Sequence, residues 1–399
     1  MIALLGMLVI LGIAWAISVD RRRIPWRIVL IGTALQLVFA VLILKTPWGR
    51  AFFTASSDVA TAFLDFADAG SRFIFGENFT EHYFAFKVLP TIIFFSSFIA
   101  LLYYWGVLQL VVKAFAKVMM KLLGTSGAES LSASANIFVG QTEAPLLIRP
   151  YVAMMTRSEL MAVMTGGFAT IAGGVLAAYV GMGVPAGHLI AASVMSAPAA
   201  LVMAKIVVPE REESKTAGEV KMAIDLPYVN AIDAAAQGAA DGLKLALNVG
   251  AMLLAFLGLI AVFNAVLGPL GGLFGFPELN LEWILGMVFR PLAWLMGVPW
   301  AEANVVGSLL GIKTVANEFV AYARMQELVE EGALSEQAQV IATYALCGFA
   351  NFSSIAIQIG GIGSIAPERK ADLARLGMRA MIAGTLACFQ TATIAGLLT

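Results

Sequence analysis

The chain has 399 residues, of which 60% are hydrophobic and only 13% are charged, and its formal net charge is −1. Soluble domains average about 25% charged residues. This composition predicts a polytopic membrane protein with little room for a soluble domain, and the balanced charge argues against nucleic acid as a partner. Cys347 and Cys388 lie in apolar stretches and are expected to be buried thiols rather than a disulfide. His82 and His188 stand at no metal-ligand spacing, so a zinc site is not expected.

Eight stretches are long and apolar enough to cross a bilayer, which takes about 20 residues of helix. They are residues 1–19, 28–44, 88–112, 161–186, 188–208, 245–270, 338–365 and 380–399. The first stretch lacks the basic start of a signal peptide and is expected to remain as a spanning helix. Residues 47–80 and 226–244 mix acidic with apolar side chains and are predicted to form interfacial helices. Residues 273–300 carry aromatic residues, Arg290 and several prolines, and receive no assignment.

Two more stretches enter the membrane but carry polar residues at their centres. In residues 126–150, Gln141, Thr142 and Glu143 are consecutive, so on one helix they would point about 100° apart. They can converge only where the backbone turns, and Gly140 and Pro145 suit such a turn. The pattern predicts a re-entrant hairpin, because non-helical backbone at membrane depth must be buried in protein or line a cavity. Residues 301–326 repeat the pattern around Glu318.

Each predicted hairpin is followed by an interrupted helix and then by an unbroken one. The first interruption falls at Thr170, Gly173 and Gly174, and the second at Asn351. Paired interrupted segments in the two halves of a chain are typical of a transporter binding site. We therefore predict an all-α polytopic membrane protein with eight transmembrane helices and two re-entrant hairpins in an inverted repeat, accompanied by interfacial helices.

Charge in the loops predicts the orientation, since basic residues mark cytoplasmic loops. Basic clusters occur in residues 21–27, 113–121 and 369–379, which fall on one side of the predicted topology. The acidic stretch of residues 327–336 falls on the other side. Both termini are then expected outside, with the first hairpin opening from the cytoplasm and the second from the exterior.

The polar centres indicate what the site binds. A carboxylate at membrane depth is unfavourable unless it is paired, hydrated or facing a cavity, so Glu143 and Glu318 are candidates for a shared polar pocket. An anionic substrate would need cations, but Arg149 and Lys313, the nearest ones in sequence, lie away from the predicted tips. The amide and hydroxyl groups around the two acids favour a neutral, hydroxyl-bearing substrate with a polar ring.

Three motifs carry a resemblance to a known family. They are Gly140-Gln141-Thr142-Glu143-Ala144-Pro145-Leu146, Asn317-Glu318-Phe319-Val320-Ala321-Tyr322, and Gly348-Phe349-Ala350-Asn351-Phe352-Ser353-Ser354-Ile355-Ala356-Ile357. In this order, and over nearly the whole chain, they resemble the concentrative nucleoside transporter family, and the short N-terminal region resembles its bacterial branch.

The resemblance implies a set of substrate contacts. The nucleobase would lie against Gly140, Gln141, Thr142 and Glu143, with Val175 beside them. The ribose hydroxyls would meet Glu318, Asn351 and Ser354. Phe349 would pack on the nucleoside, and Leu245 would add an apolar contact. The residues named here favour neither purines nor pyrimidines.

The resemblance also implies a coupling ion, which is sodium in many members of the family and a proton in some. The positions matching a sodium site are Asn136, Val139, Thr170 and Ile171. Thr170 replaces a serine of some relatives and keeps the hydroxyl. In a proton-coupled member, Glu143 or Glu318 would be the titrating group.

The family implies a homotrimer in the bacterial inner membrane that imports nucleosides by an elevator-type movement. Residues 1–120 and 209–300 would form the scaffold, and residues 121–208 and 301–399 the two repeats of a transport domain. Two other classes remain as alternatives: an intramembrane hydrolase that uses both glutamates, and a passive channel. A hydrolase would release base and ribose, and a channel would not accumulate substrate against a gradient.

Overall fold

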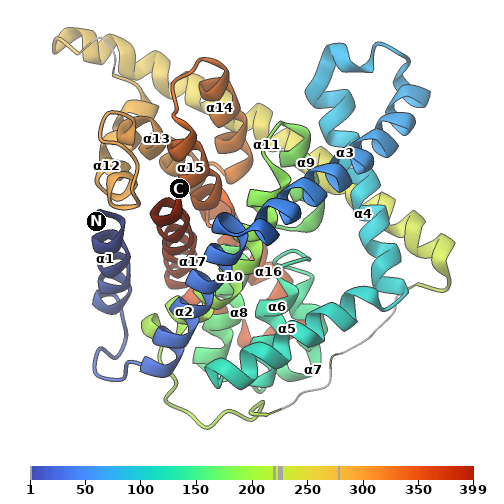
Figure 1. Cartoon of the computed structure of the whole chain (residues 1–399), viewed down its shortest axis with the longest axis vertical. Helices are drawn as coiled ribbons and strands as arrows, with labels where there is room; N and C mark the ends of the chain where they lie inside the picture. Colours follow the sequence, from blue (N-terminus) through green and yellow to red (C-terminus); the bar gives the residue numbers. More distant parts are fainter. Residues whose placement is uncertain (1, 219–221, 223–227, 277–278) are drawn as a thin grey trace.

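The computed structural model describes residues 2–218, 222, 228–276 and 279–399. Within these ranges all regular secondary structure is helical (Figure 1). Six of the helical segments described are long and apolar enough to cross a membrane. Three shorter apolar helices, α1 (Ile2–Ala16), α13 (Ala303–Val315) and α16 (Phe352–Ile365), accompany them. The chain is an all-α membrane protein, as its composition predicts.

The first part of the chain forms the outer helices of the molecule. α1 is followed by α2 (Trp26–Lys45), which packs against the later helix α10. α3 (Pro47–Phe75) is amphipathic and begins where Thr46 accepts a hydrogen bond from the Gly49 amide at 3.2 Å. The 3₁₀ turn η1 (Phe79–His82) and the π-helical turn η2 (Phe84–Val88) lead into α4 (Leu89–Tyr104).

The predicted span of residues 88–112 is wrong in its second half. α4 ends at Tyr104, and Gly106 has φ +77°, a left-handed conformation that suits glycine and turns the chain. α5 (Val107–Leu123) then leaves at a steep angle to α4 (Figure 1). Its exposed face carries lysines at every fourth position: Lys113, Lys117 and Lys121. α5 is therefore a separate amphipathic helix.

The first predicted hairpin is present as a helix, a turn and a short return. α6 (Gly127–Ala135) begins with a capping box, in which Ser126 and Glu129 satisfy each other's backbone amides. The non-helical residues 136–143 form the tip. The chain returns through η3 (Ala144–Ile148) and α7 (Arg149–Val152).

The first interrupted helix is confirmed. α8 (Arg157–Ala169) stops at Thr170, whose backbone is extended, and α9 (Gly173–Gly181) resumes after three residues. α10 (Ala186–Val207) follows as one long buried helix.

The predicted division of residues 226–270 into an interfacial helix and a span is wrong. One helix, α11 (Ala231–Leu273), runs for 43 residues, while residues 226–227 lie outside the described residues. Gly238 and Gly242 do not break it, because they permit close contact with α4: a Cβ on Gly238 would lie 2.6 Å from the Ala100 Cβ. Of residues 273–300, the structure forms α12 (Leu281–Leu295), which packs on α13, and residues 277–278 are outside the described ranges.

The second half repeats the order of the first. α13 ends at Val315, and α14 (Glu318–Glu330) begins where the Asn317 Oδ1 accepts a hydrogen bond from the Val320 amide at 2.9 Å. α15 (Glu336–Leu346) is separated from α16 by the non-helical residues 347–351, so the second predicted interruption is also confirmed.

The final helix begins earlier than predicted. After η4 (Pro367–Arg369), α17 (Lys370–Leu398) includes residues 370–379, which the sequence analysis assigned to a basic loop. This stretch is amphipathic: Leu373 and Leu376 are buried, whereas Arg375 and Arg379 are exposed. The arginines therefore lie on the open face of the first turns of a helix.

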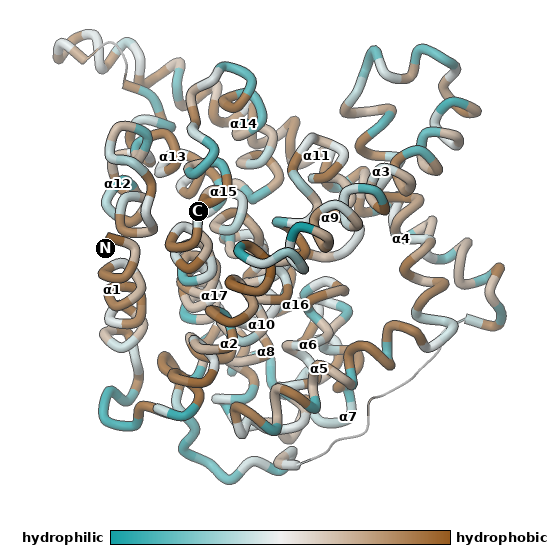
Figure 2. The backbone as a smooth tube through the Cα atoms, viewed as in Figure 1, coloured by the Kyte–Doolittle hydropathy of each residue, from teal (hydrophilic) through white to brown (hydrophobic). Residues whose placement is uncertain are grey.

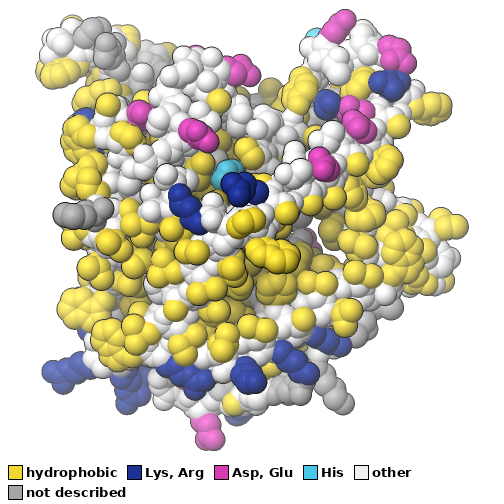
Figure 3. All heavy atoms as spheres, viewed as in Figure 1, with side chains coloured by type: hydrophobic (Ala, Val, Ile, Leu, Met, Phe, Trp, Pro, Cys, Tyr) yellow, Lys and Arg dark blue, Asp and Glu magenta, His cyan; other side chains and the backbone are white. Residues whose placement is uncertain are grey.

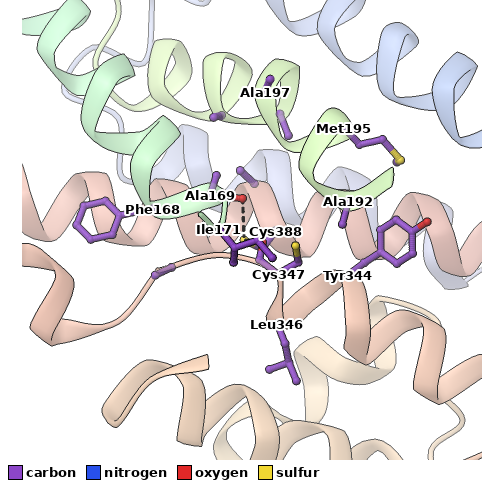
Figure 4. Packing of buried hydrophobic residues seen from close by; sticks show 14 of the residues in the cluster. Phe168, Ala169, Ile171, Ala192, Met195, Ala197, Tyr344, Leu346, Cys347 and Cys388 are labelled. Atoms are coloured by element: carbon purple, nitrogen blue, oxygen red, sulfur yellow. Dashed lines mark hydrogen bonds between the residues drawn. The ribbon is translucent and has the colours of Figure 1, made fainter. Parts of the chain in front are cut away.

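The two interruptions contact each other, and residues from both lie close together in Figure 4. The Phe349 amide donates to the Thr170 carbonyl at 3.2 Å, and the Cys388 thiol lies 3.6 Å from the Ala169 carbonyl. Gly348 makes this contact possible, because a Cβ there would lie 2.8 Å from the Phe168 carbonyl oxygen. Both cysteines are buried and free, as the sequence analysis expects.

Basic side chains are concentrated at one end of the molecule. In Figure 3 many lysines and arginines gather along the lower edge, whereas most acidic side chains lie in the upper half together with several other basic ones. The lower edge is where α5 and the loop between α1 and α2 lie (Figure 1). The tube in Figure 2 is hydrophobic along α1, α2 and α4 between these ends.

Candidate functional site

Glu318 is the first residue of α14 and lies at the tip of the second hairpin with 5% of its surface exposed. Two neutral donors hold its carboxylate. The Tyr179 hydroxyl donates to Oε1 at 2.9 Å, and the Asn351 side-chain amide donates to Oε2 at 3.1 Å. Tyr179 lies on α9 and Asn351 caps α16, so both interrupted helices contribute to this contact.

Gln141, at the tip of the first hairpin, forms a second contact with α16. Its amide nitrogen donates to the Ser354 hydroxyl at 3.2 Å, and its carbonyl oxygen accepts from the Gln358 amide at 3.0 Å. The Asn351 Oδ1 accepts from the Ser354 backbone amide at 2.9 Å and thereby joins the two contacts. Both hairpin tips therefore contact the first turns of α16.

A cavity of about 420 Å³ opens beside the first tip. Val139, Gly140 and Glu143 form one wall, and α4 and α11 form others, with Leu245 on α11. Arg149 also lines the cavity, so the prediction that it lies away from the first tip is wrong. Glu318 is not among the residues that line it. The cavity is therefore not the predicted chamber shared by both acids: Glu143 lines it and is exposed, whereas Glu318 is enclosed by its donors.

The other predicted substrate residues lie nearby in different settings. Thr142 packs against α16, where a Cβ on Gly361 would lie 2.8 Å from its Cγ2. Val175 is 3% exposed on α9, and Phe349 is partly buried within the second interruption.

The predicted cation ligands lie where the first hairpin meets the end of α8. Asn136 is 1% exposed; its Nδ2 donates to the Ser132 carbonyl at 3.0 Å, and its Oδ1 has no hydrogen-bond partner among the described residues. Thr170 donates to the Gly166 carbonyl at 2.8 Å. Gly166 also faces Asn136, since a Cβ on it would lie 3.2 Å from Nδ2. Uncharged oxygens with a free acceptor suit a monovalent cation, so these residues fit the expected group.

The sequence analysis missed two residues of the site. Tyr179 lies in an apolar helix and gives no local signal. Gln358 does give one, because it is a glutamine in an apolar stretch, four residues after Ser354 and hence on the same helix face. Its amide also donates to the Met164 carbonyl at 3.1 Å, which ties α16 to α8.

Two hairpin tips that contact one interrupted membrane helix through buried hydrogen-bonding groups are typical of a membrane transporter. Comparison with known proteins gives the family. Three family models match the chain. The model described as "Na⁺ dependent nucleoside transporter N-terminus" matches residues 5–78, and the one described as "Nucleoside recognition" matches residues 85–186. The model described as "Na⁺ dependent nucleoside transporter C-terminus" matches residues 188–396. The chain belongs to the concentrative nucleoside transporter family. It is a transporter and not an enzyme, so the intramembrane hydrolase is excluded.

Individual relatives agree with this assignment. An uncharacterized transporter of Haemophilus influenzae is 48% identical, and the match covers 99% of this chain and 97% of that protein. Human solute carrier family 28 member 3 is 44% identical over 98% of this chain, which spans 59% of that longer protein. The structure of CNTnw in an inward-facing substrate-bound state is 47% identical, covers 100% of this chain and 97% of its own, and has a TM-score of 0.94.

Proposed function

We propose that this protein imports nucleosides into the cytoplasm, driven by a sodium gradient, by alternating access of an elevator type. The observation that carries the proposal is the meeting of both hairpin tips at α16, where Glu318, Asn351, Gln141 and Ser354 form one hydrogen-bonded group. These donors and acceptors are uncharged apart from one carboxylate, which matches a neutral polyhydroxyl solute. The family supports sodium-dependent nucleoside transport.

The ribose hydroxyls bind Glu318, Asn351 and Ser354, taking the place of bonds that these side chains make with one another. The nucleobase lies against the first tip, at Gly140, Gln141, Thr142 and Glu143, with Val175 behind it. Phe349 and Leu245 supply apolar contact. The cavity beside Gly140, Glu143 and Leu245 supports this placement and has the size of a small-molecule site.

Sodium is held by Asn136, Val139, Thr170 and Ile171, and its charge stabilises the first tip against α8. The unpartnered Asn136 Oδ1 supports this assignment. A proton is the second candidate for the coupling ion. It is favoured by the burial of Glu318 among neutral donors, where a protonated carboxyl would remain hydrogen-bonded.

In the membrane, eight helices span and the two hairpins enter from opposite faces as an inverted repeat. Residues 121–208 and 301–399 form the moving transport domain, and residues 1–120 and 209–300 form the scaffold. The basic edge in Figure 3 faces the cytoplasm, with both termini outside. Three copies assemble through their scaffolds in the bacterial inner membrane.

The test is uptake of labelled uridine and adenosine into proteoliposomes, with sodium and proton gradients imposed separately. We expect intact nucleoside to accumulate above its external concentration when sodium is higher outside. Accumulation driven only by a proton gradient would mean that the coupling ion is a proton and not sodium. Equilibration without accumulation under either gradient would identify a passive channel and reject the proposal.

A further inference from the structure

Lys313 is a buried cation that the transport scheme above does not use. It lies in the last turn of α13 with 1% of its surface exposed. Its ammonium group donates to the Ala345 carbonyl at 2.8 Å. Among the described residues, no carboxylate lies within ion-pair distance of it and no other hydrogen-bond partner contacts it.

The other buried lysine shows the contrast. Lys205 Nζ lies 2.6 Å from the Glu129 carboxylate, and both side chains are almost fully enclosed. A buried charge without such a partner is strongly unfavourable unless its surroundings supply negative potential. For Lys313 the end of α15 supplies part of it, because the last carbonyls of a helix lack amide partners within the helix and carry the negative end of its dipole. The buried Glu318 carboxylate supplies a further part through its charge.

The same location in the first half of the chain is the candidate sodium site. There, Asn136 directly follows the first hairpin helix, α6, and contacts α8 one turn before that helix is interrupted. Here, Lys313 lies in the last turn of the first helix of the second hairpin and contacts Ala345, one residue before the end of α15. Each half therefore places a polar hairpin side chain against the last turns of the helix that precedes its interruption, and in the second half this side chain binds a carbonyl there.

The locations of Asn136 and Lys313 differ in the chemical group that each side chain provides. In the first half, the Asn136 Oδ1 is an oxygen without a partner. In the second half, an ammonium group already occupies the carbonyl end, five residues before Glu318 in sequence.

We propose that the Lys313 ammonium is a resident cation of the second repeat, standing where the first repeat binds its exchangeable coupling cation. It restricts coupling to one exchangeable cation per nucleoside and holds the second hairpin against α15. This inference rests on the proposed function.

The experiment measures uridine binding by purified protein over a series of sodium concentrations, with choline keeping the ionic strength constant. Lys313→Gln removes the charge and keeps a polar side chain. We expect its binding to depend more steeply on sodium than wild-type binding, because a second monovalent cation enters the vacated place. Lys313→Arg keeps the charge and should retain the wild-type slope. Lys244→Gln, at an exposed lysine on α11, is the control and should leave the slope unchanged.

An unchanged sodium dependence in Lys313→Gln overturns the inference alone. If that variant does not fold, the ratio of charge to uridine moved by the wild-type protein decides instead. One charge moved per uridine supports the inference, and two charges moved per uridine overturn it. Absence of uridine binding by the wild type at every sodium concentration would instead reject the proposed function, and this inference with it.

Discussion

Glu318 and Asn351 are both buried, and they are hydrogen-bonded to each other. Ligand hydroxyls that bind here must replace these bonds one for one, since an unsatisfied buried polar group is costly.

Glu318→Gln and Asn351→Ala should each abolish measurable uridine uptake at tracer concentrations. A lost hydrogen bond to a charged group is worth about 1.5–3 kcal/mol, which corresponds to roughly 10- to 100-fold in affinity. Uptake into proteoliposomes measures the effect, and Glu330→Gln, on the exposed face of the same helix, is the control. Wild-type uptake by either site variant would remove that residue from the site.

Asn136→Ala should weaken the sodium dependence of uptake while leaving uptake at saturating sodium detectable. The substitution deletes the unpartnered Oδ1 and leaves the backbone of the tip in place. Half-maximal sodium concentration is the measurement, with Asn248→Ala on the exposed side of α11 as the control. A sodium response identical to that of the wild type would place the cation elsewhere.

At the scale of elements, a buried ionic cluster ties the first hairpin to the helices that follow it. Lys205 on α10 contacts Glu129 on α6 at 2.6 Å and the Ser158 hydroxyl on α8 at 2.9 Å. After α10, Glu210 accepts a hydrogen bond from Thr156 at 2.8 Å, at the start of α8. The base of the hairpin is therefore fixed to α8 and α10 as one unit.

Lys205→Met should destabilise the folded protein by about 3–5 kcal/mol, because it leaves the Glu129 carboxylate buried without its partner. Thermal unfolding in detergent measures the effect. Lys244→Met removes an exposed lysine with 76% of its side chain accessible and should change the midpoint little. Equal effects of the two substitutions would mean that the buried pair adds no stability.

The elements that sequence predicts well are those with breaking residues at their ends. Gly140 and Pro145 locate the first tip, and Thr170 and Asn351 locate the interruptions, because their backbone preferences are local. Local sequence does not predict helix boundaries or site residues that depend on packing between distant helices. The acidic residues of 226–244 suggest an interfacial helix, but most of this stretch belongs to the same continuous helix as the span that follows. Gly106 turns a continuous apolar stretch that gives no other sign of ending. Tyr179 joins the site only through the tertiary fold.

For the whole molecule, the separation of charge predicts how the protein sits in the membrane. Lys113→Cys should react with an impermeant thiol reagent only from the cytoplasmic side of cells, and Glu330→Cys only from outside. Both positions are exposed. The native Cys347 and Cys388 are buried, so the unsubstituted protein serves as the unlabelled control. Labelling of both positions from one side would contradict the proposed topology.

The length of α11 has a mechanical consequence. Its 43 residues measure about 65 Å at 1.5 Å per residue, roughly twice a hydrocarbon core of about 30 Å. Such a rod cannot stand upright in the bilayer, so it must be strongly inclined or project beyond the lipid. An inclined rod accommodates a thinner or thicker bilayer by leaning a little more or less.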